Sequence, residues 1–400
     1  MPKVLQINST ANWGSTGRIA EQIGCVAMKR GWDSYIAYGR YKNPSQSNLI
    51  KIGNRLSVLL HYIEHKLFDN DGLSSRFATR NLIKKIERIS PDVVHLHNIH
   101  DHWLNYEVLF EYLNRSAIPV VWTQHDCWAF TGGCPYYMRS DCEKWQHECS
   151  SCKHKATLID RTRRQFIKKK NLFTANSKMR LVTVSKWLEG EVSKSFFSSH
   201  NITTIYNGID LQVFSQDSKI DVKEHYNIRG KKLLIALATT WSTRKGFDDY
   251  IELSNRLGQD YMIMLVGLTK DKISSLPPNV IGIRRTSNIE ELVALYASAD
   301  VLLNLSYEET FGLTTVEALA CGTPAVVYDS TASPELVTPQ TGIVVKPGDI
   351  DGVLNAIEQI VMKGKACYGR ACRERAEKYF DKDLSFEKYV DLYEETLDSH

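Results

Sequence analysis

The stretch LNLSYEETFGLTTVEALACGTPAVVYD, residues 303–329, carries a complete strand–loop–helix–strand pattern. Its first apolar run predicts a buried strand that ends near residue 306, and AVVYD (325–329) predicts another. Between them, Gly312 opens an apolar helical pattern that extends to about residue 321. A helix that joins two nearly continuous apolar strands is typical of a parallel sheet covered on both faces, so the stretch predicts an α/β fold.

The same alternation of strands and helices runs through the whole chain in two series. Strands of the first series are predicted at 3–8, 34–39, 92–98, 119–125, 180–185 and 202–207. Strands of the second are predicted at 232–238, 261–267, 279–284, 301–306, 325–329 and 342–345. The polar junction 206–221 contains an Asn-Gly turn signal. We therefore expect two doubly wound, Rossmann-like domains, residues 1–208 and 209–383, with a last helix at 384–398 that packs back on the first.

The composition is that of an ordinary globular protein. The 400 residues are 43% hydrophobic and 24% charged, and the sequence contains no run of 18 apolar residues that would predict a transmembrane helix. The opening MPKVLQINST lacks the apolar core of a signal peptide. We therefore predict a cytoplasmic protein.

Positive charge is concentrated in residues 151–186, which hold eleven Lys or Arg residues against one acid, Asp160. Within this region, RTRRQFIKKKNLF (161–173) interleaves six cations with large apolar residues. Such a segment suits an anionic membrane surface, which would make the protein peripheral at the inner face of the cell membrane. The alternative is a solvated helix face. Nucleic-acid binding is not predicted, because the segment has few aromatic residues for base stacking.

Two cations follow the first strand of the second series. Arg244 and Lys245 stand at the expected start of a helix, where positive charge opposes the helix dipole unless an anion binds there. Their alternative role is that of solvated surface charges. Further along, Glu317 shares a helix face with Leu313 and Cys321, so it needs hydrogen-bond donors. The two hydroxyls of a sugar diol would supply them. A nearby loop or a buried arginine is the structural alternative.

The segment EETFGLTTVEALACGTP (308–324) resembles the signature of family 4 retaining glycosyltransferases of the GT-B fold. Glu309 and Glu317 are separated by seven residues, as in that family, and the surrounding residues agree as well. Further marks fall in order: YNGID (206–210), RKG (244–246) and YASADVLLNLS (296–306). The resemblance covers nearly the whole chain, and it implies two Rossmann-like domains that face each other across a cleft.

In the second domain, the resemblance implies a site for a nucleotide-sugar donor. Arg244 and Lys245 would hold the diphosphate and Glu317 would accept hydrogen bonds from the ribose hydroxyls. Glu309 would face the transferred sugar. Backbone contacts to sugar and phosphate would come from four consecutive residues: Thr310, Phe311, Gly312 and Leu313.

The first domain would contribute the acceptor side and a further phosphate contact. Gly14 and Gly17 follow its first strand, at a predicted helix start where backbone N–H groups can meet phosphate. His125 stands at a strand end, and in the family a histidine here reaches the donor sugar near the reacting carbon. The predicted acceptor-site residues are His97, Asn98, His100 and Asp126. For each histidine, a packing role is the alternative.

The family's reaction moves a sugar from a nucleotide-sugar, here UDP- or GDP-linked, to an acceptor hydroxyl with retention at the anomeric carbon. The resemblance implies same-face displacement, with His125, Glu309, Arg244 and Lys245 as the catalytic residues and no catalytic metal. A lipid-linked glycan of a cell-surface polysaccharide is the expected acceptor. The alternative is a sugar-nucleotide epimerase or a phosphorylase-like enzyme of the same fold.

Five of the nine cysteines fall between residues 127 and 152, and the last two form a single Cys-x-x-Cys. In a chain without a secretion signal, such a cluster favours metal over disulfides. The insert 127–155 is therefore predicted to hold a structural zinc ion, and it resembles an insert of the colanic-acid and capsule glycosyltransferases. Reduced thiols and disulfides are the alternatives. The predicted ligands are Cys134, Cys142, Cys149 and Cys152.

Overall fold

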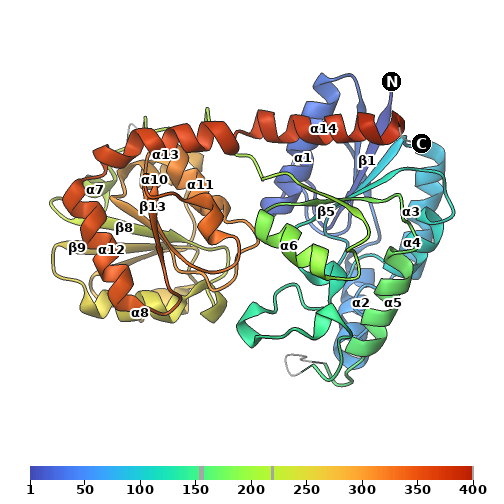
Figure 1. The fold of residues 1–400 in the computed structure, drawn as a ribbon, viewed down its shortest axis with the longest axis horizontal. Coiled ribbons are helices and arrows are strands. Elements are labelled where there is room, and N and C mark those ends of the chain that lie inside the picture. The colour runs from blue at the N-terminus through green and yellow to red at the C-terminus, as the bar shows by residue number, and fades with distance from the viewer. Residues whose placement is uncertain (153–156, 218–219, 399–400) are drawn as a thin grey trace. The chain divides into compact units, whose positions relative to one another are not determined.

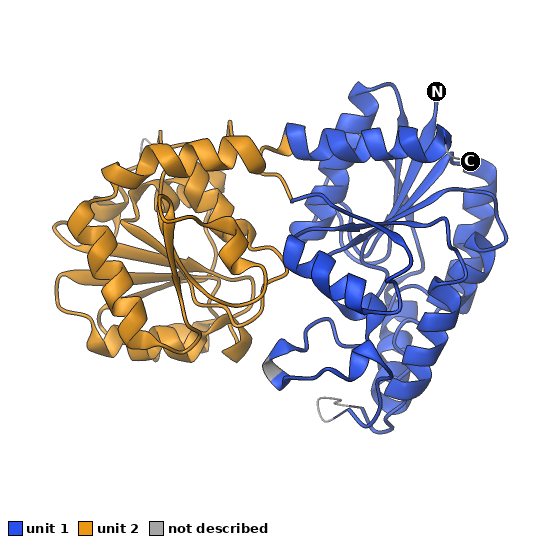
Figure 2. Cartoon of the chain, viewed as in Figure 1, with its two compact units in different colours: residues 1–206, 383–400 blue, residues 207–382 orange. Residues whose placement is uncertain are grey.

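The structure, a computed structural model, describes residues 1–152, 157–217 and 220–398. The chain divides into two compact units, residues 1–206 with 383–400 and residues 207–382 (Figure 2). Each unit is an α/β structure in which helices cover the faces of a parallel sheet (Figure 1). No helix in the described part of the chain is long and apolar enough to cross a membrane.

The sheet of unit 1 has seven parallel strands in the order β3-β2-β1-β4-β5-β6-β7. Its strands are β1 (Lys3–Asn8), β2 (Asp33–Tyr38), β3 (Asn48–Lys51), β4 (Val93–Leu96), β5 (Val120–Gln124), β6 (Arg180–Thr183) and β7 (Asn201–Thr204). Its helices are α1 (Gly14–Lys29), α2 (Arg55–Phe68), α3 (Arg76–Ile89), α4 (Tyr106–Leu113), α5 (Thr162–Phe173), α6 (Lys186–Lys194) and α14 (Lys382–Asp398). The chain runs outward from β1 in one direction, then returns to continue from β4 in the other.

The sheet of unit 2 has six parallel strands in the order β10-β9-β8-β11-β12-β13. Its strands are β8 (Lys232–Leu237), β9 (Tyr261–Val266), β10 (Val280–Ile283), β11 (Val301–Asn304), β12 (Ala325–Tyr328) and β13 (Gly342–Val345). Its helices are α7 (Val222–His225), α8 (Phe247–Arg256), α9 (Lys270–Ile273), α10 (Ile289–Ser298), α11 (Leu313–Ala320), α12 (Ile350–Lys363) and α13 (Ala366–Tyr379). Here the strand order reverses between β8 and β11.

The last helix, α14, belongs to unit 1. Phe386, Tyr389 and Tyr393 of α14 are buried in one hydrophobic cluster with Val4 of β1 and Val93 of β4. The hydroxyl of Tyr393 lies 2.6 Å from Nδ1 of His95 in β4. The helix therefore completes the core of the first unit although it lies at the far end of the sequence.

One strand of unit 1 was not expected from the sequence. β3 is a four-residue edge strand whose residues are all partly or fully exposed, and it pairs only with β2. An edge strand of this kind needs no apolar run, so the pattern that predicts the buried strands does not detect it.

Candidate active site

In open parallel sheets, ligands bind beyond the carboxyl ends of the strands at the point where the strand order reverses. In unit 2 this point lies between β8 and β11. Arg244 and Lys245 occupy the short 3-10 helix η4 (Thr243–Lys245), which follows β8, and Glu309 lies in the loop that follows β11. The structure thus brings both predicted cations and one predicted carboxylate to the switch point of their sheet.

Direct contacts join the two loops. Nζ of Lys245 forms an ion pair with the Glu309 carboxylate, and the two side chains are 17% and 14% exposed. Nη1 of Arg244 donates to the carbonyl oxygen of Glu308 at 3.0 Å, and the Tyr307 N–H donates to the Arg244 carbonyl at 2.9 Å. These bonds hold the cations against the loop that carries Glu309.

Glycine is required between η4 and α8. Gly246 has a φ of +68°, and a Cβ at this position would lie 2.1 Å from the carbonyl oxygen of Leu305. A side chain here would push the loop with Arg244 and Lys245 away from the end of β11. The RKG motif therefore depends on this glycine for the position of its two cations.

Gly312 is the N-cap of α11, with a φ of +107°, and no side chain caps this helix. The first N–H groups of an uncapped helix can bind an anion or a hydroxyl oxygen. Phe311 is buried, with its ring centroid 5.8 Å from that of Phe380, so its side chain packs in the core. Thr310 and Leu313 are half-buried on either side. At Phe311 and Gly312, backbone groups are therefore the means of meeting a ligand.

Glu317 is half-buried on α11, and one of its carboxylate oxygens accepts a hydrogen bond from the hydroxyl of Tyr296 on α10 at 2.8 Å. Burial raises the pKa of the Cys321 thiol to about 12, and the Glu317 carboxylate acts in the same direction. Tyr296 was not among the predicted site residues, although it opens the quoted motif YASADVLLNLS.

The corresponding switch point of unit 1 lies between β1 and β4. Gly14 and Gly17 follow β1, His97 and Asn98 follow β4, and His125 follows β5. The N–H of Asn98 donates to Oδ1 of Asn8 at the end of β1, which ties the two strand ends together.

The two glycines of unit 1 serve different purposes. Gly14 has a φ of +66° at the first residue of α1, and a Cβ there would meet no atom within 4 Å. At Gly17, a Cβ would lie 2.6 Å from Oγ1 of Thr10. Gly17 therefore allows α1 to approach the preceding loop, whereas space is left open beside Gly14 at an uncapped helix start.

A chain of buried hydrogen bonds runs from β1 to His125. Oε1 of Gln6 lies 3.0 Å from Nε2 of His97, and Nδ1 of His97 lies 3.0 Å from Nε2 of His125. Burial lowers the pKa of His97 well below its usual value and that of His125 to about 4. Both imidazoles are therefore neutral at pH 7.

This chain changes the role predicted for His97. Both of its ring nitrogens are engaged by Gln6 and His125, and the residue is 1% exposed. We therefore replace the predicted acceptor contact of His97 by a positioning role behind His125. Gln6, which was not singled out in the sequence, belongs to the same chain of contacts.

His100 and Asp126 form an ion pair, with Nε2 of His100 2.9 Å from Oδ2 of Asp126. Burial lowers the pKa of His100, but the carboxylates of Asp126 and Asp101 outweigh this effect and hold the pKa well above its usual value. His100 is therefore cationic at neutral pH, next to neutral His125. The other oxygen of Asp126 accepts from the N–H of Trp128 at 2.9 Å.

Comparison with known proteins identifies both halves of the chain. Residues 17–213 match the family described as Glycosyltransferase Family 4, and residues 218–379 match the family described as Glycosyl transferases group 1. The chain belongs to the family 4 glycosyltransferases of GT-B fold.

Relatives and solved structures agree with this family. The chain is 22% identical to WcaC of Escherichia coli K12, assigned by name to colanic acid biosynthesis, over 98% of this chain and 99% of that protein. It is 27% identical to N-acetyl-alpha-D-glucosaminyl L-malate synthase of Bacillus anthracis, over 54% of this chain and 58% of that one.

Two solved structures share the fold over nearly the full length of both chains. Sucrose-phosphate synthase of Thermosynechococcus elongatus superposes with a TM-score of 0.76 at 16% identity, covering 100% of each chain. WaaG, a glycosyltransferase involved in lipopolysaccharide biosynthesis, superposes with a TM-score of 0.66 at 14% identity, covering 98% and 99%.

The sulfur atoms of the four predicted zinc ligands do not lie together in the structure. No three of the four sulfurs, all on described residues, lie within 4.8 Å of one another. Cys149 is the most enclosed: its sulfur accepts the Gly132 N–H at 3.2 Å, and burial raises the pKa of its thiol to about 11. The zinc ion of the insert therefore stays a prediction. Residues 153–156 of the insert lie outside the described part of the chain.

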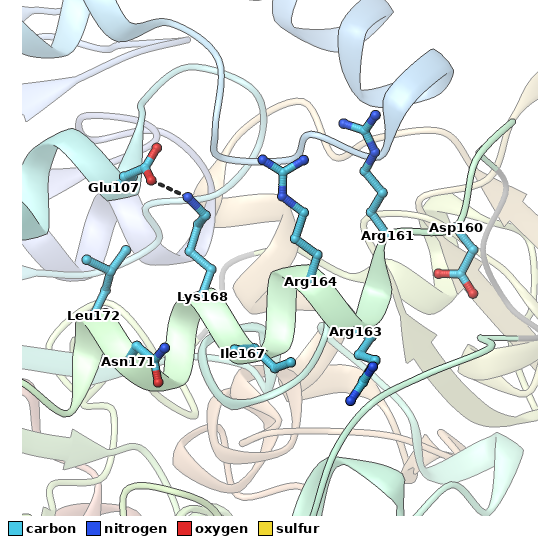
Figure 3. Close-up of a pocket in the computed structure, with 9 residues that line it drawn as sticks. All are labelled: Glu107, Asp160, Arg161, Arg163, Arg164, Ile167, Lys168, Asn171 and Leu172. Atoms are coloured by element: carbon cyan, nitrogen blue, oxygen red, sulfur yellow. Dashed lines mark hydrogen bonds and ion pairs between the residues drawn. The ribbon is translucent and has the colours of Figure 1, made fainter.

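The basic segment of the glycosyltransferase is less exposed than its sequence suggested. Phe166, Lys169 and Phe173 of α5 are at most 2% exposed, and Nζ of Lys169 lies 3.4 Å from the centre of the Trp128 ring. Figure 3 shows that Lys168 reaches Glu107, with which it forms an ion pair. Two aromatic residues and Lys169 of α5 thus face the core, whereas Arg163, Arg164 and Lys170 are exposed. Four of the six cations line a hollow beside the helix. The lining residues are Glu107, Asp160, Arg161, Arg163, Arg164, Ile167, Lys168, Asn171 and Leu172 (Figure 3).

Proposed function

We propose that this glycosyltransferase moves a sugar from a UDP- or GDP-linked donor to an acceptor hydroxyl, with retention at the anomeric carbon. The observation that carries the proposal is the cluster at the switch point of unit 2. There, Arg244 and Lys245 stand beside Glu309, and Glu317 on α11 is held by Tyr296.

The cluster offers matched groups for each part of a nucleotide-sugar. Arg244 and Lys245 would bind the diphosphate together with the uncapped start of α11. Glu317 would accept hydrogen bonds from the ribose diol, with Tyr296 holding its carboxylate in place. Glu309 would accept from hydroxyls of the transferred sugar. Two structures of Alr3699/HepE of Anabaena share this fold, with TM-scores of 0.67 and 0.65 at 15% identity. One contains UDP and glucose and the other contains UDP-glucose, which supports a donor of this class.

We propose same-face displacement as the chemical step. The acceptor oxygen forms a bond to the anomeric carbon as the bond from this carbon to the leaving phosphate oxygen breaks. The acceptor proton passes to the diphosphate, whose developing charge is stabilised by Arg244 and Lys245. Because two cations already provide this stabilisation, the step requires no divalent metal ion.

His125 would act in this step as a neutral hydrogen-bonding group. Its low pKa keeps the imidazole uncharged, and His97 and Gln6 fix the orientation of the ring. Since Oε1 of Gln6 accepts from Nε2–H of His97, Nδ1 of His97 accepts from Nε2–H of His125. Nδ1 of His125 would then accept a hydrogen bond from a sugar hydroxyl and orient the substrate without adding positive charge beside the developing oxocarbenium ion. Both ring nitrogens of His100 are paired, with Asp126 and with Asp101, so Asp126 would accept from hydroxyls of the acceptor while His100 holds it in place.

We further propose that the acceptor is a lipid-linked glycan and that unit 1 reaches it at an anionic membrane surface. α2 exposes an apolar side, and its large exposed residues are Leu56, Leu59, Leu60, Tyr62, Ile63, Leu67 and Phe68. The Arg161 guanidinium lies 5.8 Å from the centre of the Phe68 ring, and Nζ of Lys66 lies 5.6 Å from that of the Tyr62 ring, so cations border this side. An apolar helix face flanked by Arg and Lys is typical of a protein that lies in a membrane interface. α2 replaces α5 as the apolar element of this surface.

A thermal-shift panel tests the donor site. Wild type and Glu317→Ala would be heated with UDP, GDP, ADP and CMP. Ligand at 100 times its Kd stabilises by about 2.7 kcal/mol. We expect one nucleotide to raise the Tm of the wild type and to leave that of the variant unchanged; no shift with any nucleotide would contradict the proposed donor class.

An epimerase would convert the nucleotide-sugar without acceptor, whereas a transferase requires the acceptor for turnover.

A further inference from the structure

Unit 1 holds a cluster of metal-binding side chains that the proposed reaction does not use. His65 lies in the last turn of α2, Asp71 in the loop that follows α2, and His102 in the loop between β4 and α4. One ring nitrogen of each histidine and one carboxylate oxygen of Asp71 lie within 4.8 Å of one another. Nε2 of His102 and Oδ1 of Asp71 are 4.0 Å apart.

Two of these atoms are buried without a hydrogen-bond partner among the described residues. They are Oδ1 of Asp71 and Nε2 of His102. The other oxygen of Asp71 accepts from Nε1 of Trp128 at 2.9 Å. A buried carboxylate oxygen without a hydrogen-bond donor is unfavourable, and Nε2 of His102 at 4.0 Å lies beyond hydrogen-bond distance. Trp128 orients the carboxylate as outer partners orient metal ligands.

The neighbouring His61 does not belong to the ligand set. Its Nε2 accepts the Gly72 N–H at 3.1 Å and its Nδ1 lies 2.9 Å from Oγ of Ser75. His61 therefore fixes the loop that carries Asp71. Nε2 of His102, by contrast, has no hydrogen-bond partner among the described residues, so His102 can act as a ligand and His61 cannot.

The backbone around His102 supports the same conclusion. Asp101 and His102 have φ values of +77° and +65°, in the left-handed region that residues other than glycine rarely adopt. Two consecutive residues in this region need compensation from the surrounding structure. The ion pair of Asp101 with Nδ1 of His100 at 3.3 Å provides part of it, and a bond from the imidazole of His102 to a metal ion would add to it.

We propose that His65, Asp71 and His102 bind a divalent transition-metal ion, Zn²⁺ by the chemistry of the ligands. Two imidazole nitrogens and one carboxylate oxygen form a common zinc ligand set, and water would complete the tetrahedron. Zinc bonds of about 2.0–2.2 Å place neighbouring ligand atoms roughly 3.4 Å apart, so the three side chains approach by about 1 Å on binding. The ion would tie α2 to the loop that carries His100. Its three ligands are not among the residues proposed for the sugar transfer.

The experiment measures zinc stoichiometry and zinc-dependent Tm in four forms of the full chain. The first two are the wild type and His65→Ala/His102→Ala. The third is Cys149→Ala/Cys152→Ala, which removes the alternative thiolate site. The fourth is His225→Ala, a matched control at an exposed histidine of unit 2. We expect the histidine double variant to bind one zinc fewer than the wild type and to lose the stabilisation by added Zn²⁺. The cysteine variant and the His225→Ala control would keep this zinc ion and the stabilisation by added Zn²⁺.

Cobalt provides a second measurement on folded protein. Co²⁺ added to the metal-free cysteine variant would give the visible absorption of tetrahedral Co²⁺ without thiolate charge-transfer bands. Asp71→Asn in the same background would weaken Co²⁺ binding at least tenfold. The proposal is overturned if the cysteine variant binds neither zinc nor cobalt, or if the histidine double variant retains the zinc content and the zinc-dependent Tm of the wild type.

Discussion

Lys245, which follows the first strand of unit 2, forms an ion pair with Glu309, which follows the fourth. The two residues are 64 positions apart in the sequence. They meet because β8 and β11 are neighbours at the point where the strand order reverses. The pair joins the cation proposed for the diphosphate to the carboxylate proposed for the sugar. Substitution of Lys245 therefore tests the diphosphate contact, and substitution of Glu309 tests the sugar contact.

Lys245→Ala is expected to lower kcat by roughly 10²- to 10³-fold, since it removes one fixed group that stabilises the leaving diphosphate. Lys232→Ala is the matched control, because Lys232 is the first residue of β8, at the end of the strand opposite to Lys245. Steady-state kinetics with the donor identified by thermal shift would measure the effect. Equal kcat values for Lys245→Ala and the wild type would contradict a catalytic role.

Tyr296→Phe is expected to weaken binding of the nucleotide by about 1 kcal/mol, roughly fivefold in Kd, because Glu317 loses the donor that holds it. Tyr226→Phe offers a close control: the Tyr226 hydroxyl donates to Glu291 at 2.9 Å in the same unit. Isothermal titration with the nucleotide would distinguish the two. If both variants bind as the wild type does, Tyr296 has no part in the donor site.

The sequence predicted the two sheets, the glutamate pair and its cations because these features are local. Buried parallel strands produce apolar runs, and a loop motif such as RKG or EETFG is read within a few residues. The bond between Tyr296 and Glu317 joins residues 21 positions apart, and the contact of Gln6 with His97 spans 91. Such pairs depend on strand order, which a sequence pattern does not contain.

The basic segment shows the opposite case. Its charge pattern predicted a surface helix, but Lys169 is buried beneath Trp128 and donates to the carbonyl oxygens of Trp128 and Thr131. A lysine can bury its alkyl chain and pair its ammonium with carbonyl groups, so charge alone did not identify the exposed side of α5. On α2, the leucines are exposed, although their hydrophobicity alone would predict that they lie in the core.

His125 gives a prediction for the dependence of stability on pH. Its pKa is lowered to about 4 by burial, from an ordinary value of about 6.5. Between these two values the unfolded chain binds a proton that the folded chain does not, so stability falls as the pH is lowered through this window. The full effect is on the order of 3 kcal/mol.

Chemical unfolding of wild type and His125→Asn at pH 8, 6 and 4.5 would measure this effect. The difference in the free energy of unfolding between the two proteins should shift in favour of the variant as the pH falls. Exposed His225→Asn controls for the loss of a histidine. A difference between wild type and His125→Asn that is the same at all three pH values would contradict a buried, neutral His125.

Leu59→Glu/Ile63→Glu tests the proposed membrane surface. Leu59 and Ile63 are 53% and 43% exposed and lie one helical turn apart on α2, so the two glutamates place negative charge on its apolar side without disturbing the core. We expect sedimentation with vesicles rich in anionic lipid to fall at least tenfold for this variant. Met362→Glu, at a residue that is 80% exposed in unit 2, should sediment as the wild type does. Equal binding of the wild type to anionic and neutral vesicles would contradict an electrostatic contribution to membrane binding. Undiminished binding of the α2 variant would contradict a role of α2 in it.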